Sequence, residues 1–198
     1  MPNTILLNNK IYHFKEDELP CLITYKEKTG GSQFTVSMIA DLFLQGSKIL
    51  FFTAYPMAKE NFLEQINGSE SKTAYITNVE QLNTNIQAII LESGNEKLFL
   101  EAVKELPDIT ERVILVKNIE AFNQDVLDSC VPLSKVILSG NIDTCTAKKQ
   151  IVNKKYNTTI IFSPPETILP VTTPPLEKYM GYFSSNNKTG LIGLKLNN

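Results

Sequence analysis

The feature that most constrains the fold is a series of short, continuous apolar runs along the middle of the chain. Runs of three to six residues without polar alternation are typical of strands that are buried on both faces. Such strands belong to parallel sheets, whose two faces are covered by helices. The predicted strands are Cys21–Thr24, Lys48–Thr53, Ala88–Leu91, Val113–Val116, Val136–Leu138 and Thr159–Phe162.

Amphipathic helical patterns separate these runs. The clearest is Ser32–Gln45, which places apolar residues on one face and is followed by Gly46, a residue typical of helix carboxyl termini. Alternation of strand and helix predicts an α/β fold with a mostly parallel, doubly wound sheet flanked by helices, and ligands beyond the carboxyl ends of the strands. The other predicted helices are Pro56–Ile66, Asn95–Leu106 and Ala121–Cys130.

The size of the chain favours one domain. A length of 198 residues with 42% hydrophobic content suits one well-buried core. We therefore expect a single domain over 1–198. It divides into an N-terminal hairpin extension over 1–19, a core over 20–164 and a C-terminal β-hairpin within 165–198. The hairpin strands are predicted at Thr4–Leu7, Ile11–Phe14, Lys178–Ser184 and Gly190–Leu196.

The segment from Tyr25 to Ser32 lies between the first buried strand and the long helix, where a phosphate loop would stand. That loop reads G-x-x-x-x-G-K-[ST], and its backbone amides and lysine hold phosphates. Aligned on Gly30 and Ser32, Tyr25 occupies the first glycine position and Gly31 the lysine position. A Gly-Gly turn that leads into a capped helix is the alternative. The candidate nucleotide-binding residues are Lys26, Lys28, Thr29, Gly30, Gly31 and Ser32.

The order of these features resembles the RecA superfamily of P-loop NTPases, particularly its KaiC and DnaB-like branch, from Leu22 to about Pro164. The segment 42–53 resembles that family's helix end, glycine and second strand, and 87–93 resembles its Walker B strand. The resemblance implies a RecA-like fold, with ATP and Mg²⁺ as the cofactors if any are bound. It also implies that Glu92 replaces the Walker B aspartate and binds Mg²⁺. A solvated glutamate at a strand end is the alternative.

Two groups that support hydrolysis in this family are absent. No lysine follows Gly30, and the second strand runs into Thr53-Ala54-Tyr55-Pro56 with no acid before Glu60. Losing both should lower the rate of phosphoryl transfer by several orders of magnitude. We expect no catalytic residues, and a pseudo-ATPase that acts as a structural or regulatory subunit through a protein partner or a homo-oligomer. In the alternative, Lys26 or Lys28 completes an ATPase in an oligomer.

A basic stretch near the end of the core suggests a third function. Lys148, Lys149, Lys154 and Lys155 are candidates for contacts with nucleic-acid phosphates. The net charge of -2 and the pI of about 5.5 favour a solvated face instead. An accessory protein that binds nucleic acid is therefore an alternative rather than the main expectation.

The remaining residues with reactive side chains are interpreted as structural. Cys21, Cys130 and Cys145 lack the spacing of a metal site, and His13, the sole histidine, lies on a predicted hairpin strand. No stretch approaches the roughly 20 apolar residues of a membrane span, nor does the start of the chain resemble a secretory signal. We expect a cytoplasmic protein that does not enter membranes.

Two asparagines follow buried strands. Asn118 and Asn141 stand where RecA-like proteins carry polar residues that sense the γ-phosphate. Asparagine is also an ordinary turn residue after a strand, and this interpretation is favoured.

Overall fold

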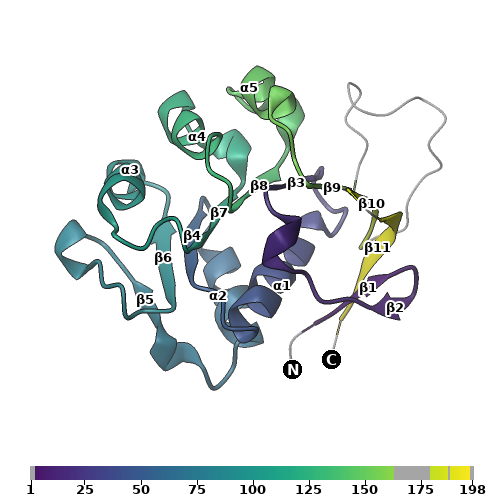
Figure 1. Ribbon diagram of the computed structural model, residues 1–198, viewed down its shortest axis with the longest axis horizontal. Helices are drawn as coiled ribbons and strands as arrows, with labels where there is room; N and C mark the ends of the chain where they lie inside the picture. The colour runs from purple at the N-terminus through teal and green to yellow at the C-terminus, as the bar shows by residue number, and fades with distance from the viewer. Residues whose placement is uncertain (1–2, 163–178, 187, 197–198) are drawn as a thin grey trace.

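The computed structural model describes residues 3–162, 179–186 and 188–196. It confirms the predicted α/β class, because a mostly parallel sheet is flanked by helices and its C-terminal strands are antiparallel (Figure 1). The sheet order is β2-β1-β11-β10-β9-β3-β8-β7-β4-β6-β5. The strands are β1 (Thr4–Leu7), β2 (Lys10–Ile11), β3 (Cys21–Thr24), β4 (Ile49–Thr53), β5 (Thr73–Tyr75), β6 (Ala88–Glu92), β7 (Val113–Lys117), β8 (Val136–Gly140), β9 (Thr158–Ile161), β10 (Met180–Ser185) and β11 (Thr189–Lys195).

The sheet has a parallel part and an antiparallel part. Every neighbouring pair from β9 to β5 is parallel. The pairs formed by β10, β11, β1 and β2 are antiparallel. Strands at both ends of the chain extend the core sheet, and β1 pairs along β11 from Thr4 opposite Lys195 to Leu7 opposite Ile192. The strand predicted at Ile11–Phe14 is instead the two-residue β2, Lys10–Ile11. Residues 165–178 of the predicted C-terminal hairpin lie outside the described residues.

In the part of the chain that the structure describes, five α-helices cover the two faces of the sheet. They are α1 (Gly31–Leu44), α2 (Pro56–Gln65), α3 (Glu96–Glu105), α4 (Gln124–Cys130) and α5 (Lys148–Asn153). Figure 1 shows α1 and α2 on one face and α3, α4 and α5 on the other. None of the helices in the described ranges is long and apolar enough to cross a bilayer.

The predicted helix Ala121–Cys130 differs from the structure. A 3-10 turn over Ile119–Ala121 comes first, and α4 begins after Asn123, whose side chain accepts the amide of Val126 at 3.1 Å. An asparagine that caps a helix in this way accepts a hydrogen bond from a first-turn amide that has no acceptor within the helix. Helix α5 and the edge strand β5 were not predicted, because both are short and carry few apolar residues.

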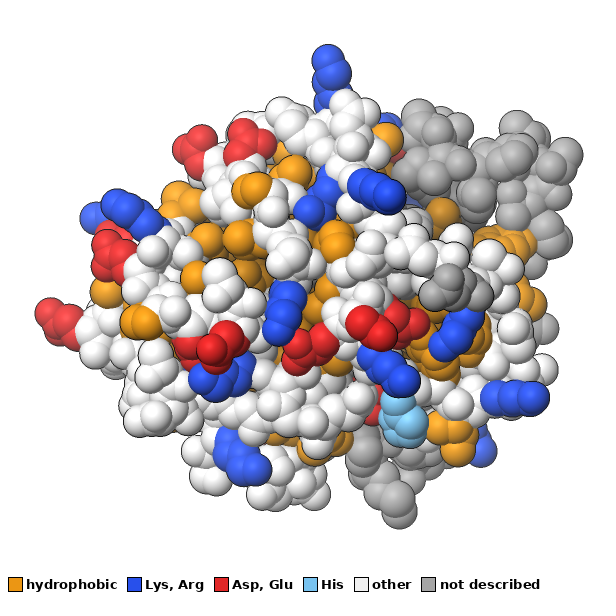
Figure 2. Space-filling view, in the orientation of Figure 1, with side chains coloured by type: hydrophobic (Ala, Val, Ile, Leu, Met, Phe, Trp, Pro, Cys, Tyr) orange, Lys and Arg blue, Asp and Glu red, His pale blue; other side chains and the backbone are white. Residues whose placement is uncertain are grey.

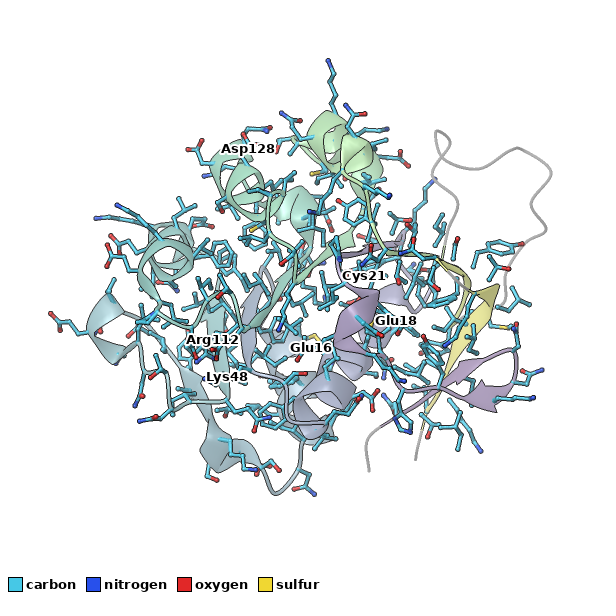
Figure 3. All side chains as sticks on the ribbon, in the orientation of Figure 1. Glu16, Glu18, Cys21, Lys48, Arg112 and Asp128 are labelled. Atoms are coloured by element: carbon cyan, nitrogen blue, oxygen red, sulfur yellow. The ribbon has the colours of Figure 1, made fainter. Side chains whose placement is uncertain are left out.

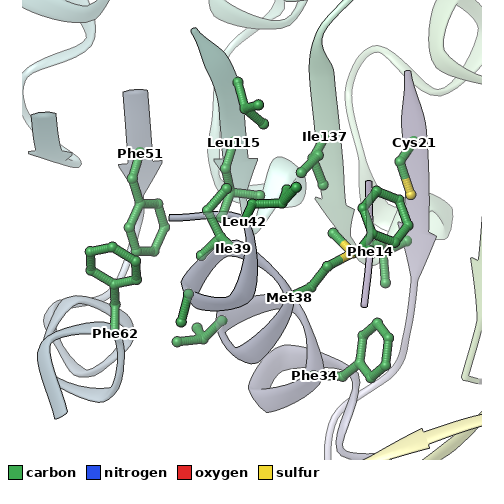
Figure 4. Close-up of a cluster of buried hydrophobic side chains, with 14 of the residues drawn as sticks. Phe14, Cys21, Phe34, Met38, Ile39, Leu42, Phe51, Phe62, Leu115 and Ile137 are labelled. Carbon is green, nitrogen blue, oxygen red and sulfur yellow. The ribbon is translucent and has the colours of Figure 1, made fainter. Parts of the chain in front are cut away.

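The core has two apolar layers, one on each face of the sheet. On the side of α1 and α2, Phe51 of β4 meets Phe62 of α2 with their ring centroids 5.7 Å apart (Figure 4). On the other side, the ring of Phe52 stacks on Phe99 at 4.5 Å. Successive residues of a strand point to opposite faces, so the continuous apolar runs fill both layers. The same alternation determines which side chains of each strand reach the site.

Candidate functional site

A polar cleft opens where β3, β7 and β8 end, beside the start of α1. Its volume is about 520 Å³. It lies beyond the carboxyl ends of parallel strands, where the sequence analysis placed a ligand. The lining residues are Tyr25, Lys26, Glu27, Lys28, Gly30, Ser32, Tyr55, Asn118, Glu120, Asn141 and Thr144.

The predicted loop therefore forms one wall of this cleft, although two of its residues face elsewhere. Thr29 donates its hydroxyl to the carbonyl of Lys26 at 2.8 Å, so it stabilises the turn of the loop. Gly31 is buried at the first position of α1. Lys26, Lys28, Gly30 and Ser32 line the cleft. The first helical amides remain available to it, because α1 begins without a side-chain cap.

Two tyrosines fill the space beside the glycines of the loop. A Cβ atom added at Gly31 would lie 2.6 Å from Cγ of Tyr25, and one at Gly30 would lie 2.9 Å from Cγ of Tyr179. Gly30 also has a φ of +89°, in the left-handed region that favours glycine. The Tyr25 side chain therefore closes the position that the lysine occupies in the phosphate-loop pattern. A side chain at Gly31 does not fit without displacing Tyr25.

Replacing Gly31 by alanine is expected to destabilise the protein by about 1 to 3 kcal/mol, since overpacking forces neighbouring groups to move. Tyr25→Gly should offset part of this loss when combined with Gly31→Ala, because it removes both the Cβ atom, 2.4 Å from the new methyl group, and the ring behind it. Chemical denaturation of the single and double variants measures this coupling. Additive effects of the two substitutions would contradict the packing described.

A row of buried polar side chains lies beneath the cleft, on the α1 face of the sheet. Thr53 of β4 is opposite Lys117 of β7, and Lys117 is opposite Ser139 of β8. All three are at least 98% buried. The Ser139 hydroxyl lies 2.7 Å from that of Thr35 in α1. The row therefore joins the sheet to the helix that follows the loop.

Lys117 is a buried cation at the end of a strand. Its ammonium donates to Oδ1 of Asn118 at 2.9 Å. Burial lowers the pKa of Lys117 to about 8, against the nearby negative charge of Glu120, which acts to raise it. The group still carries a proton at neutral pH, so a positive charge lies next to the cleft wall that Asn118 forms.

Glu120 is the second charged residue that the sequence analysis did not identify. Its Oε2 accepts the backbone amide of Asn141 at 2.9 Å, and its Oε1 accepts the Asn118 side-chain amide at 3.5 Å. The Asn141 side chain also accepts a hydrogen bond from the amide of Asp143 at 3.1 Å. This is the turn interaction that the sequence favours for an asparagine after a strand. Both predicted asparagines thus line the cleft while stabilising its floor.

Glu92 is not brought to the loop. Strands β8, β7 and β4 separate β6 from β3, and four steps across the sheet amount to roughly 19 Å. Its carboxylate instead forms an ion pair with Lys59 at 2.8 Å and accepts the Tyr75 hydroxyl at 3.3 Å. Among the described residues, no group of three or more His, Cys, Asp or Glu side chains could hold a metal ion.

The basic stretch is partly occupied by structural contacts. Lys148 forms an ion pair with Asp143 at 3.0 Å. Lys154 donates to the carbonyls of Val131 and Leu133 at the end of α4. Lys149 and Lys155 are both exposed. On the face shown in Figure 2, basic side chains are scattered among acidic ones rather than gathered in one field.

The remaining reactive residues are not among those that line the cleft. Cys21, Cys130 and Cys145 are buried and free, and burial raises the thiol pKa of each. His13 lies 3.0 Å from Asp41 through Nδ1. This contact attaches the chain after β2 to α1.

Comparison with known proteins relates this geometry to a fold. Neither a family model nor a curated protein sequence matches the chain. A solved structure described as an ATPase superposes with a TM-score of 0.62 at 9% identity, covering 100% of this chain and 87% of that one. The chain has a P-loop NTPase fold.

Further structures share this P-loop NTPase fold. The genome packaging NTPase B204 of Sulfolobus turreted icosahedral virus 2, in complex with sulfate, gives a TM-score of 0.61 at 11% identity, covering 93% of this chain and 99% of that one. EssC (ATPases 2 and 3) from Geobacillus thermodenitrificans gives 0.62 at 10% identity, covering 98% of this chain and 40% of that one. At these identities the likeness shows the fold alone.

Proposed function

We propose that this chain is a catalytically degenerate P-loop protein of the RecA, KaiC and DnaB-like branch. It acts in the cytoplasm as a structural or regulatory subunit, through contacts with a protein partner or a second copy, and binds nucleotide weakly or not at all. The observation that carries the proposal is the closed lysine position, where the Tyr25 ring packs against Gly31.

The residues of the cleft do not fit a magnesium–nucleotide complex. Mg²⁺ in phosphoryl-transfer sites is held by carboxylates together with substrate phosphates. Glu120 has both oxygens engaged by amides, and Glu27 is exposed on the loop. Lys117 adds a positive charge next to them. A divalent cation would therefore find the carboxylate of Glu120 already engaged, that of Glu27 on the exposed loop, and a buried ammonium behind Asn118.

The proposal that this chain works through protein contacts is supported by apolar side chains beside the cleft. Tyr55, which lines the cleft, is 53% exposed, and Met57 in the first turn of α2 is 70% exposed. Large exposed apolar side chains of this kind are enriched at protein interfaces. A partner that covers them would also cover the mouth of the cleft.

One observation favours the alternative of an oligomeric ATPase. Lys26 and Lys28 are both exposed and both line the cleft. A lysine at either position is free to reach phosphates in the same subunit or across an interface. This alternative requires nucleotide-dependent assembly, which the pseudo-ATPase does not.

An assay of ATP turnover tests the proposal. The purified chain with ATP and Mg²⁺ is expected to show no turnover above about 0.01 per second, below the roughly 1 to 1000 per second of typical enzymes. Turnover at an ordinary rate that Ser32→Ala abolishes would falsify the proposed function. If Lys26→Ala or Lys28→Ala abolished that turnover, the oligomeric ATPase would be supported in its place.

A further inference from the structure

We infer that a small cavity at the opposite edge of the sheet from the cleft binds a small zwitterion, of the class of glycine and serine. The cavity lies where β9 begins and β10 ends, beside the 3-10 turn Glu16–Glu18. It shares no lining residue with the cleft, so the inference is independent of the proposed function. The lining residues are Lys15, Asp17, Glu18, Asn157, Thr158, Ser185, Asn186 and Lys188.

The walls of the cavity are held by hydrogen bonds between separate segments of the chain. The Asn157 side chain donates to the carbonyl of Leu19, and its oxygen accepts the side-chain amide of Asn186 at 3.4 Å. The Tyr12 hydroxyl donates to Oε1 of Glu18, whose other oxygen accepts a backbone amide at 3.1 Å. These groups are occupied by structural contacts, so the shape of the cavity does not depend on a ligand.

The hydroxyl of Thr158 is a buried polar group that a ligand could use. Thr158 is 0% exposed, and its Oγ1 atom has no hydrogen-bond partner among the described residues. It stands opposite Ser185 in the pair of β9 and β10, so the two side chains project from the same face of the sheet, and both residues line the cavity. Burying a hydroxyl without a partner is unfavourable. A ligand that bonded to it from the cavity would remove this penalty.

Three charged side chains at the cavity are available to a ligand. Within the described ranges, neither Lys15 nor Lys188 forms an ion pair, and the Asp17 carboxylate accepts no hydrogen bond. The Lys188 ammonium lies 5.3 Å from the centre of the Tyr12 ring. Together with Glu18, the charges of the lining residues sum to zero. A ligand with one positive and one negative group therefore leaves the cavity neutral.

A small amino acid matches these available groups. Its carboxylate would accept hydrogen bonds from Lys188 and from the Thr158 hydroxyl, while its ammonium would donate to Asp17. Hydrogen bonds between charged partners are roughly twice as strong as neutral ones. The cavity volume is about 140 Å³, the space of roughly five water molecules at about 30 Å³ each. This limits the ligand to the size of glycine, alanine or serine and excludes a large side chain such as that of tryptophan.

Calorimetric titration of the full chain with glycine at pH 7 tests the inference. We expect saturable binding with a dissociation constant of about 1 mM or below. Acetate and methylammonium each carry one of the two charges and should bind at least about tenfold more weakly, since one charged hydrogen bond is lost. Tryptophan should not bind. Equal binding of acetate and glycine, or binding of tryptophan at the same site, would contradict the zwitterion and the size of the cavity.

Two variants connect glycine binding to this cavity. Thr158→Val removes the unpartnered hydroxyl, so it should fold as the wild type does and bind glycine about fivefold more weakly, as the loss of one neutral hydrogen bond does. Lys188→Met should weaken binding by at least about tenfold. Lys195→Met, which changes an exposed lysine of β11 outside the cavity, is the matched control and should bind as the wild type does.

The inference is overturned if glycine does not bind, or if either Thr158→Val or Lys188→Met binds it as tightly as the wild type. None of these results bears on ATP turnover, which tests the proposed function separately.

Discussion

Replacing Arg112 by methionine is expected to lower the free energy of unfolding by about 3 to 5 kcal/mol, as breaking a buried ion pair does. Arg112 is fully buried at the amino edge of the sheet, just before β7. Its Nε and Nη2 atoms donate to Asp108 at 2.9 Å. Figure 3 shows the residue beside Lys48, which forms an ion pair with the same carboxylate at 2.9 Å.

The guanidinium also connects three segments of backbone. It donates to the carbonyls of Ile49 at the start of β4, of Gln87 and Ile86 before β6, and of Thr84. Methionine fills a similar volume but removes the guanidinium donors from these carbonyls and from Asp108, which is why the loss should be large.

Urea denaturation of Arg112→Met measures this effect. Lys97→Met is the control, because the Lys97 side chain is 90% exposed and its ion pair with Glu101 spans 3.8 Å. That substitution should change the free energy of unfolding by less than about 0.5 kcal/mol. Similar losses for the two variants would show that Arg112 does not hold these strands together.

Replacing Lys117 by methionine is expected to have the opposite effect, a gain of about 3 kcal/mol at pH 7. Burial lowers the pKa of Lys117 from 10.5 to about 8, and each pKa unit corresponds to about 1.4 kcal/mol. At pH 7 the lysine is charged in the folded and unfolded states, so the wild type bears the whole penalty of burying the charge.

The pH dependence follows from the direction of the shift. Between pH 8 and 10.5 the folded state has lost the Lys117 proton while the unfolded state retains it, so the wild type gains stability as the pH rises through this window. Lys117→Met lacks this gain, and the difference between the two proteins should close by about pH 10.5. Denaturation at pH 7, 9 and 10.5 measures it. A difference that stayed constant with pH would mean that Lys117 is not buried as a charge.

Much of the fold could be predicted because its signals are local. The apolar run Val113–Val116 identifies a buried strand by itself, and the periodicity of residues 32–45 identifies α1 by itself. Such patterns do not determine the order of the strands in the sheet. Glu92 was predicted because residues 87–93 resemble a Walker B strand. Strands β8, β7 and β4 lie between β6 and β3, so the predicted metal ligand is separated from the loop.

Lys117 and Ser139 were missed for the same reason. Lys117 ends one strand and Ser139 lies near the end of another, and their adjacency depends on β7 pairing with β8. In the sequence, a lysine after an apolar run indicates solvent, since charged residues are rarely buried. The one signal in the sequence was the neighbouring Asn118, which was interpreted without reference to Lys117. Recognising a buried charge required the register of the sheet.

The pairing of β1 with β11 has a consequence for the synthesis of the chain. Residues 4–7 are synthesised long before residues 192–195, their partners on one side, while the two-residue strand β2 pairs with them on the other. Until residue 195 has been added, β1 lacks its longer neighbour and has an open edge, and such edges pair readily with other chains. The sheet edge at β1 is therefore completed only when β11 has been made.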